Sequence, residues 1–157
     1  MMLIRNIRDE DYTPIITVVD SWWGGRHMAD MLPRLFFVHF QETSFITEHN
    51  SAPIAFLIGF VSQTHRTEAY IHFVGVHPEY RQQGIGEKLY QHFFDTVRAR
   101  GCDTVRCVTS PVNKGSIAFH RRMGFHAEHG DTEIDGMPVK VAYDGEGQDR
   151  VLFVKKI

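Results

Sequence analysis

The sequence predicts an α+β domain in which a central mixed, mostly antiparallel sheet is flanked by helices. Short apolar runs separated by turn residues fill the first half of the chain, whereas a helical period begins at Ile85. Strand and helix patterns then alternate to the C-terminus, as in a sheet covered by helices. At 157 residues and 43% hydrophobic composition, the chain suits one core, so we expect a single domain over residues 1–157.

The first half of the chain is expected to form a meander after an initial strand and helix. Residues 3–7 form a short apolar run, and residues 9–19 open with acids and Pro14, which suits a helix start. The glycines after Trp22 end that helix, and a second short helix is expected near residues 27–32. Four strands then follow, at residues 36–40, 44–49, 54–62 and 69–76.

The second half is defined by its helix pattern. Ile85, Leu89, Phe93 and Val97 recur every four residues, and Gly101 suits the helix end. A strand is expected at 104–109, a helix from Asn113 to Met123, and closing strands at 125–127 and 151–154. Because the long helix connects the strand before it to the strand after it, these two strands should be parallel, and their splayed ends offer a ligand entrance.

Charge and cysteine content narrow the function classes. With 17 Lys and Arg against 19 Asp and Glu, the formal net charge is -2, so no basic field attracts nucleic acid or an anionic bilayer. The N-terminus lacks the apolar run of a secretory signal, and the longest apolar stretch is shorter than the about 20 residues of a membrane helix. Cys102 and Cys107 make no disulfide framework. We expect a soluble, cytoplasmic protein without nucleic-acid or membrane partners.

The segment VHPEYRQQGIG, residues 76–86, carries the strongest chemical signal. Gly84 and Gly86 let backbone N–H groups approach a ligand closely, the following helix adds the positive end of its dipole, and Arg81 supplies a fixed charge. Such a loop can hold a pyrophosphate. It is neither a Walker P-loop nor a three-glycine dinucleotide loop, because their defining residues are missing. Taken alone, it could equally be an ordinary glycine-bearing turn.

Two motifs together resemble the GCN5-related N-acetyltransferase (GNAT) superfamily. Its acetyl-CoA motif, Arg or Gln, two residues, Gly, one residue, Gly or Ala, is matched by RQQGIG at residues 81–86. The stretch NKGSIAFHRRMGF at residues 113–125 is similar to its second motif, in which an Asn starts a helix that ends in Gly-Phe. The resemblance implies a GNAT-like fold with an acyl-CoA cleft, acetyl-CoA as acyl donor, and direct transfer to a primary amine of a small molecule or protein.

The resemblance also assigns the acetyl-CoA contacts. A strand backbone would pair with the pantetheine arm, loop N–H groups would hold the pyrophosphate, and the Asn of the second motif would bond the pantetheine. Ile85 and Phe119 belong to the same set, with packing as their alternative role. The expected contacts are Phe73, Val74, Gly75, Val76, Arg81, Gln82, Gln83, Gly84, Ile85, Gly86, Asn113 and Phe119.

The residues that would transfer protons depart from the family pattern. Many members carry a Tyr that protonates the departing CoA thiolate where this chain has His120, whose alternative role is packing. Several members place a carboxylate base on the strand at residues 71–76, which here holds no Asp or Glu. The candidate bases are therefore His72 or a water chain to Glu68 or Tyr70. A half-buried structural histidine and deprotonation by bulk water remain the alternatives.

Metal chemistry, the acceptor and a competing function class complete the expectations. The ten histidines include no HExxH arrangement, so we expect no metal site. The segment at residues 22–31 either faces the acceptor or packs in the core or in a homodimer contact. The acidic loop at residues 130–150 either faces the acceptor or is solvated surface. The acceptor amine itself is not identified. The missing carboxylate and the Tyr-to-His departure keep open a noncatalytic acyl-CoA-binding regulatory module.

Overall fold

The computed structural model describes all 157 residues, which gather into two compact units. The first comprises Met1–Val61 and Ile71–Arg100, and the second comprises Ser62–Tyr70 and Gly101–Ile157. The first residues of strand β4 (Glu68–Val76) belong to the second unit, and the residues from Ile71 onward belong to the first. The single domain over residues 1–157 stays a prediction.

The first unit holds a sheet with the order β1-β2-β3-β4. β1 pairs with β2 and β2 with β3 in antiparallel fashion, and the β2–β3 register shifts between Thr47 and Glu48. The strands expected at residues 3–7, 44–49, 54–62 and 69–76 and the long helix that begins at Ile85 are confirmed within a few residues. The elements are β1 (Met2–Asn6), η1 (Asp9–Asp11), α1 (Tyr12–Trp22), η2 (Ala29–Met31), α2 (Leu35–His39), η3 (Gln41–Thr43), β2 (Phe45–His49), β3 (Ala52–Val61), β4, η4 (Pro78–Tyr80) and α3 (Ile85–Ala99).

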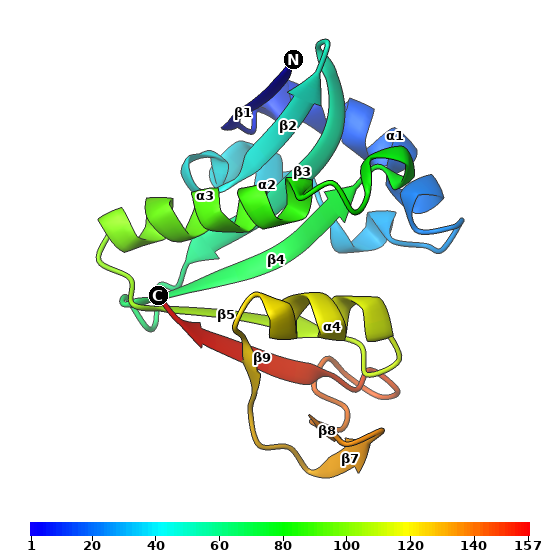
Figure 1. Cartoon of the computed structure of the whole chain (residues 1–157), viewed down its shortest axis with the longest axis vertical. Helices are drawn as coiled ribbons and strands as arrows, with labels where there is room; N and C mark the ends of the chain where they lie inside the picture. The colour runs from blue at the N-terminus through cyan, green and yellow to red at the C-terminus, as the bar shows by residue number, and fades with distance from the viewer. The chain divides into compact units, whose positions relative to one another are not determined.

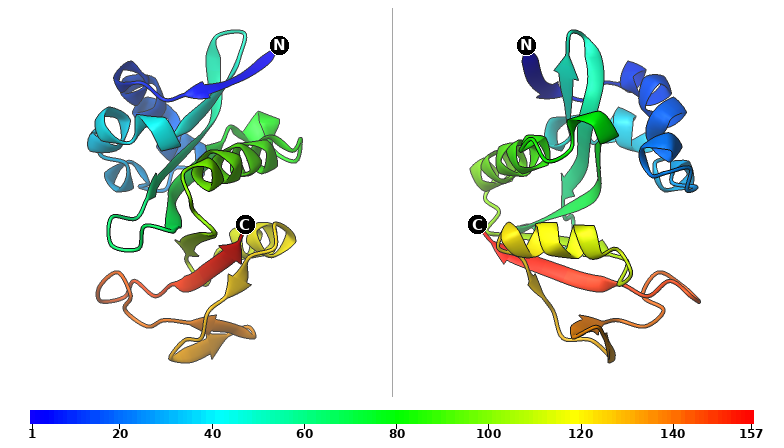
Figure 2. Two further views of the ribbon diagram at one scale, coloured as in Figure 1. Left: turned by 90° about the vertical axis from the view of Figure 1, so that its left-hand side faces the viewer. Right: turned by 45° about the vertical axis from the view of Figure 1, so that its right-hand side comes forward.

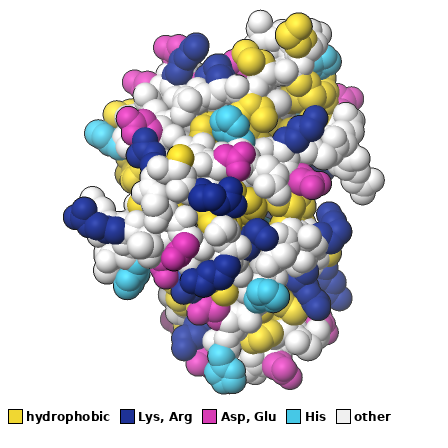
Figure 3. Space-filling view, turned by 60° about the vertical axis from the view of Figure 1, so that its left-hand side comes forward, with side chains coloured by type: hydrophobic (Ala, Val, Ile, Leu, Met, Phe, Trp, Pro, Cys, Tyr) yellow, Lys and Arg dark blue, Asp and Glu magenta, His cyan; other side chains and the backbone are white.

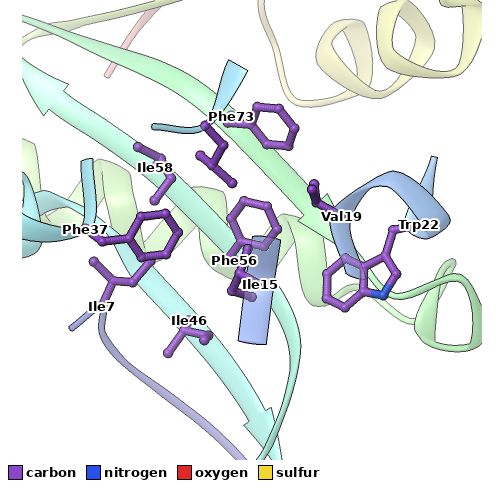
Figure 4. Close-up of a cluster of buried hydrophobic side chains, with 10 residues drawn as sticks. Ile7, Ile15, Val19, Trp22, Phe37, Ile46, Phe56, Ile58 and Phe73 are labelled. Carbon is purple, nitrogen blue, oxygen red and sulfur yellow. The ribbon is translucent and has the colours of Figure 1, made fainter. Parts of the chain in front are cut away.

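Helices cover both faces of this sheet, with α1 and α2 on one face and α3 on the other (Figures 1 and 2). Successive residues of β2 show the two faces: Ile46 joins the core under α1, whereas the ring of Phe45 meets that of His92 on α3 at 4.5 Å. The core on the α1 side is dominated by aromatic and β-branched side chains (Figure 4). Its buried members are Ile7, Ile15, Val19, Trp22, Leu32, Phe37, Ile46, Phe56, Ile58 and Phe73.

One predicted strand is wrong. Residues 36–40 were expected to be extended, but α2 (Leu35–His39) is helical and buries only Phe37 fully. The Phe36 N–H bonds to the carbonyl of Pro33 at 3.2 Å, which starts the turn, and the rings of Phe36 and Phe40 lie 5.3 Å apart, one helical turn from each other. A short apolar run does not by itself distinguish a strand from a buried helical turn.

Strand β4 alternates between buried and half-buried residues as its pattern predicts. Gly75 lies on the buried face, where the rings of Phe56 and Trp23 come very close to it. A Cβ added to Gly75 would meet Phe56 Cε1 at 2.6 Å and Trp23 Cη2 at 2.9 Å. Glycine at this position therefore allows the close approach of aromatic core side chains.

Replacing Gly75 by Ala should lower the free energy of unfolding by about 1–3 kcal/mol, because the added methyl group would overlap the ring of Phe56, which is fully buried. Gly115→Ala in α4 (Lys114–Arg122) is the matched control. A Cβ there has Asn113 Oδ1 at 3.9 Å as its nearest neighbour, so the gain in helix propensity should stabilise the protein by about 0.5–1 kcal/mol. Urea unfolding measures both changes. If both substitutions changed the free energy of unfolding in the same direction, overpacking at Gly75 would be contradicted.

The second unit carries the rest of the mixed sheet, in the order β4-β5-β9-β6. The parallel arrangement of β4 and β5 is confirmed, with Glu68 opposite Thr104 and Tyr70 opposite Arg106. β9 pairs antiparallel with both β5 and β6. The splaying of the parallel strands stays a prediction. The elements are β5 (Thr104–Thr109), α4, β6 (His126–Ala127), β7 (Thr132–Ile134), β8 (Met137–Val139) and β9 (Val151–Lys156).

The acidic region at residues 130–150 is more ordered than a loop. It contains the hairpin β7–β8, turned by Asp135 and Gly136, both of which have positive φ. Residues 141–148 are exposed, as expected of solvated surface. The predicted α+β class with a mixed, mostly antiparallel sheet and flanking helices is confirmed.

The surface carries both signs of charge. Figure 3 shows Lys and Arg side chains interspersed with Asp and Glu over the face that it presents. No helix combines the length and the apolar character that crossing a bilayer would require.

Candidate functional site

The loop between β4 and α3 is built to present backbone N–H groups. His77 caps the short turn η4, since its Nδ1 accepts the Glu79 N–H at 3.0 Å. Gln82 and Gly84 then take left-handed conformations, with φ of 60° and 78°. Left-handed geometry costs a non-glycine residue about 1–2 kcal/mol, and such strain is concentrated at ligand-binding positions. The strain at Gln82 was not visible in the sequence.

Helix α3 begins directly after this turn, with Gly84 as its N-cap. Its first helical hydrogen bond runs from the Lys88 N–H to the Gly84 carbonyl at 3.0 Å. The N–H groups of Ile85, Gly86 and Glu87 therefore precede the intrahelical ladder and make no bond within it. Together with the helix dipole, such N–H groups suit an anion. The Ile85 side chain is buried, so only its backbone is available to a ligand.

The charged side chain of the motif points elsewhere. The Arg81 guanidinium donates from Nε to the Val76 carbonyl at 3.2 Å and from Nη2 to the Trp22 carbonyl. Gln83 likewise turns back, since its side-chain amide donates to the Glu79 carbonyl at 3.2 Å. In this conformation the side chains of Arg81 and Gln83 are both engaged by backbone carbonyls of the protein.

The strand residues assigned to the cofactor precede this loop in the first unit. The Phe73 ring stacks on Phe56 at 5.6 Å, and Gly75 is packed against the same core. Val74 and Val76 are half-buried on the alternate positions. The side chains of Phe73 and Gly75 are thus used in packing, which leaves their backbone for any ligand.

His72 is held by two contacts that the sequence did not reveal. Its Nε2 lies 2.6 Å from the Met31 carbonyl, and because a carbonyl only accepts, Nε2 carries the ring proton. Its ring stacks on Phe36 at 4.3 Å and 13°. The neutral ring therefore presents Nδ1 as its proton acceptor. A backbone carbonyl has no sequence signal, and Phe36 was expected to lie in a strand.

The other base candidates lie in the second unit and are less suited to accept a proton. Burial raises the pKa of Tyr70, so its phenol stays protonated at neutral pH. Glu68 is paired with Arg106, whose Nε lies 3.0 Å from the carboxylate and which also pairs with Glu128. The hydrogen bond to Glu68 raises the pKa of Arg106, whose guanidinium is charged at any accessible pH.

The second unit also contains the motif helix α4. Asn113 caps it, with Oδ1 accepting the Ser116 N–H at 3.1 Å, which confirms the expected helix start. Phe119 is half-buried, and the Arg122 guanidinium lies over its ring at 5.9 Å. The cofactor contacts of Asn113 and Phe119 stay predictions.

His120 is packed inside this unit rather than exposed. It is 7% exposed, its ring stacks on Phe153 at 5.2 Å, and it meets Phe125 edge-on at 5.3 Å. Nδ1 lies 2.7 Å from the Ser116 carbonyl and so carries the proton of the neutral ring. Burial lowers the pKa of His120, against the opposing effect of the Ser116 bond. The geometry favours the packing role, because an acid would need the imidazolium; the acid role stays a prediction.

The lowered pKa of His120 predicts a pH-dependent stability. Between that pKa and the ordinary histidine value of about 6.5, the unfolded chain binds a proton that the folded chain does not, so stability falls as the pH falls. His120→Phe keeps an aromatic ring but cannot titrate. The loss of Tm between pH 8 and pH 5 should be smaller in this variant than in the wild type.

His126→Gln, which replaces an exposed histidine of the same unit, is the matched control for the loss of a histidine. Parallel Tm curves for wild type and His120→Phe would contradict the burial argument. Turnover by the same variant tests the acid role: a loss smaller than about tenfold argues against general acid catalysis by His120.

The predicted residues thus fall into two sets. The first unit holds His72, residues 73–76 and residues 81–86, whereas the second holds Tyr70, Asn113, Phe119 and His120. No cluster of three or more His, Cys, Asp or Glu side chains is arranged to hold a metal ion. Cys102 and Cys107 are both buried, and burial raises the pKa of the Cys107 thiol.

Comparisons with known proteins agree with this architecture. An N-acetyltransferase of Methanocaldococcus jannaschii that is itself uncharacterized is 33% identical over 89 residues, which are 54% of this chain and 39% of that relative. The chain thus spans well under half of the relative's length. Ard1 from Thermoplasma volcanium superposes with a TM-score of 0.80 at 18% identity, covering 99% of this chain and 97% of Ard1.

A putative acetyltransferase from Salmonella typhimurium, solved with its cofactor acetyl-CoA, superposes with a TM-score of 0.71 at 20% identity, over 99% of this chain and 93% of that one. At these identities, both structures speak for the fold. The sequence profile described as "Acetyltransferase (GNAT) family" matches residues 3–125. Since that match takes in most of the chain, including the glycine-bearing loop and the α4 motif, the protein belongs to the GNAT acetyltransferase family.

Proposed function

We propose that this protein is an N-acetyltransferase that transfers the acetyl group of acetyl-CoA directly to a primary amine in a ternary complex. The observation that carries the proposal is the turn at residues 81–86, where left-handed Gln82 and Gly84 lead into the N-terminus of α3. Its backbone N–H groups and the helix dipole suit a pyrophosphate. Membership of the GNAT family supports the same donor.

The donor would be held mainly by backbone groups. The N–H groups of Ile85, Gly86 and Glu87 are proposed to bind pyrophosphate oxygens, because they lie ahead of the first helical hydrogen bond of α3. The backbone of residues 73–76 is proposed to pair with the amides of the pantetheine arm as an added strand would. Asn113 uses Oδ1 to cap α4, so its side-chain NH2 is the group proposed to donate to the pantetheine.

The acceptor amine must lose a proton before it can attack a thioester. An alkyl ammonium has a pKa of about 10.4, so neutralising it at pH 7 costs about 4–5 kcal/mol. His72 is the proposed base, because its Nε2 proton is engaged by the Met31 carbonyl and Nδ1 is therefore the accepting atom. The stacked Phe36 ring fixes the plane of the imidazole. This arrangement orients a base as a paired histidine does in other enzymes.

The proposed bond changes are balanced as follows. Nδ1 of His72 first takes one proton from the ammonium and releases it to solvent. The neutral amine nitrogen then uses its lone pair to form a bond to the thioester carbonyl carbon, whose π electrons move to the oxygen, and the nitrogen loses its second proton to Nδ1 of His72 as the carbonyl re-forms. The carbon–sulfur bond breaks in the same step, and the CoA thiolate takes up a proton. His120 stands where many family members carry the residue that donates this proton. Water is the alternative donor, and the packing of His120 favours water.

Thiol release from acetyl-CoA across a panel of amines tests the proposal. The panel contains small primary amines, peptides with a free N-terminus and peptides whose only amine is a lysine side chain. We expect thiol release above the amine-free rate for at least one class, with the acetylated product identified by mass spectrometry. Acetyl-CoA binding without turnover of any amine would favour the noncatalytic acyl-CoA-binding module instead.

A further inference from the structure

The segment at residues 22–31, after helix α1, is ordered by a local turn and by contacts from other parts of the first unit. α1 ends at Trp22, and Gly24 and Gly25 follow with φ of 67° and 88° and no atom near the position of a Cβ. Two successive glycines without neighbours give this part of the chain little stiffness of its own. A tight turn closes on the helix end, since the Gly24 and Gly25 N–H groups bond to the carbonyls of Ser21 and Asp20 at 3.1 and 2.8 Å. Contacts from elsewhere in the first unit add to this turn in fixing the segment.

Contacts from other parts of the first unit meet this segment at defined points. Arg81 donates to the Trp22 carbonyl at its beginning. The Asp20 carboxylate accepts the N–H groups of Met28 and Ala29 at 2.8 and 2.9 Å near its end. The Met31 carbonyl, which closes the segment, is the partner of His72. Residues 22–31 thus begin with the carbonyl that Arg81 binds and end with the carbonyl that His72 binds.

Arg81 has the chemistry to join two elements. Its Nε reaches the Val76 carbonyl at the end of β4, while its Nη2 reaches the Trp22 carbonyl at the end of α1. A planar guanidinium can serve two acceptors at once, whereas an ammonium is a single point charge. A cation is also favoured at a helix C-terminus, where the carbonyls lack intrahelical partners.

We propose that Arg81 is a positioning residue that fixes residues 22–31, and through the Met31 carbonyl the orientation of His72, rather than a group that binds acetyl-CoA by its charge. Its consequence for catalysis rests on the proposed function. Through Arg81, the loop that is proposed to bind acetyl-CoA would also order residues 22–31, which orient the proposed base His72.

The two tryptophans provide a direct readout of this contact. Trp22 and Trp23 are the only tryptophans in the chain, and they lie at the carbonyl that Arg81 binds. Trp22 is 4% exposed, and the Trp23 ring packs on Phe73 at 5.1 Å. Arg81→Ala and Arg81→Lys should both shift the tryptophan emission to longer wavelength and increase acrylamide quenching. Arg100→Ala, which removes a bond to Glu42, is the matched arginine control and should leave both signals unchanged.

Affinity and catalysis should respond differently. As a positioning residue, Arg81 should change the acetyl-CoA Kd by less than about threefold on substitution by Ala or Lys, while kcat/KM for the amine falls about 10²-fold, as expected of a misplaced catalytic group. A charged contact with the pyrophosphate would instead make the Ala variant lose about 10–150-fold in affinity, with Lys restoring most of it. That result, with unchanged tryptophan signals, would overturn the proposal.

The two proposals fail separately. If the wild-type protein turns over no amine, the proposed function fails, but tryptophan emission and acetyl-CoA affinity still decide the role of Arg81. If the wild type is active and both Arg81 variants keep wild-type emission, quenching and kcat/KM, the positioning role is wrong while the transferase activity stands.

Discussion

His72→Gln should lower kcat/KM for the amine by about 10²–10⁴-fold, the usual contribution of a general base. A glutamine amide can still donate to the Met31 carbonyl as His72 Nε2 does, but it cannot take a proton from an ammonium. Because the proposed donor contacts do not involve the imidazole, the acetyl-CoA Kd should stay within about threefold of wild type. Steady-state rates of thiol release and equilibrium binding measure the two quantities.

The pH dependence makes this prediction sharper. As the pH rises toward the amine pKa of about 10.4, the acceptor becomes neutral without a base, so the deficit of His72→Gln should shrink. His39→Gln is the control, since His39 is exposed at the end of α2. A loss of less than about tenfold at neutral pH would assign the deprotonation to bulk water or to another group.

Gly84→Val should raise the acetyl-CoA Kd by about 10–150-fold, which corresponds to one lost hydrogen bond to a charged group. A β-branched residue resists the φ of 78° that Gly84 adopts, so the turn must rearrange and turn its N–H groups away from the pyrophosphate. Isothermal titration calorimetry with acetyl-CoA measures this change without requiring turnover.

Gly101→Val separates ligand binding from backbone strain. Gly101 follows the other end of α3, has a φ of 91° and, like Gly84, has no atom within 4 Å of a Cβ. Both substitutions should therefore cost similar stability, about 1–2 kcal/mol. Only Gly84→Val should weaken binding. Equal Kd values for the two variants would remove the pyrophosphate assignment from this turn.

Much of the fold was predictable because it depends on local periodicity. The four-residue spacing from Ile85 to Val97 predicted α3, and the apolar run at residues 69–76 predicted the strand that β4 forms. Asn113 was recognisable as a helix cap because its side chain acts on a backbone three residues away. The strand expected at residues 36–40 failed, because a five-residue stretch with four apolar side chains suits either structure until its tertiary neighbours are known.

The candidate site divides in the same way. The motif at residues 81–86 and its glycines were readable in the sequence, because left-handed turns and close backbone approach require specific residue types. Replacement of the family tyrosine by His120 was also readable. What His120 does was not, since its Ser116 bond and its place between Phe125 and Phe153 depend on how α4 packs.

The sequence by itself thus determined the GNAT motifs, the helix and strand periods and the turn that presents backbone N–H groups. Only the tertiary structure decided that Arg81 binds the carbonyl of Trp22, 59 residues away, and that His72 binds that of Met31, 41 residues away. The reason is that every residue carries a backbone carbonyl, so a side chain bonded to one leaves no pattern in the sequence. Folding alone selects which carbonyl lies within reach.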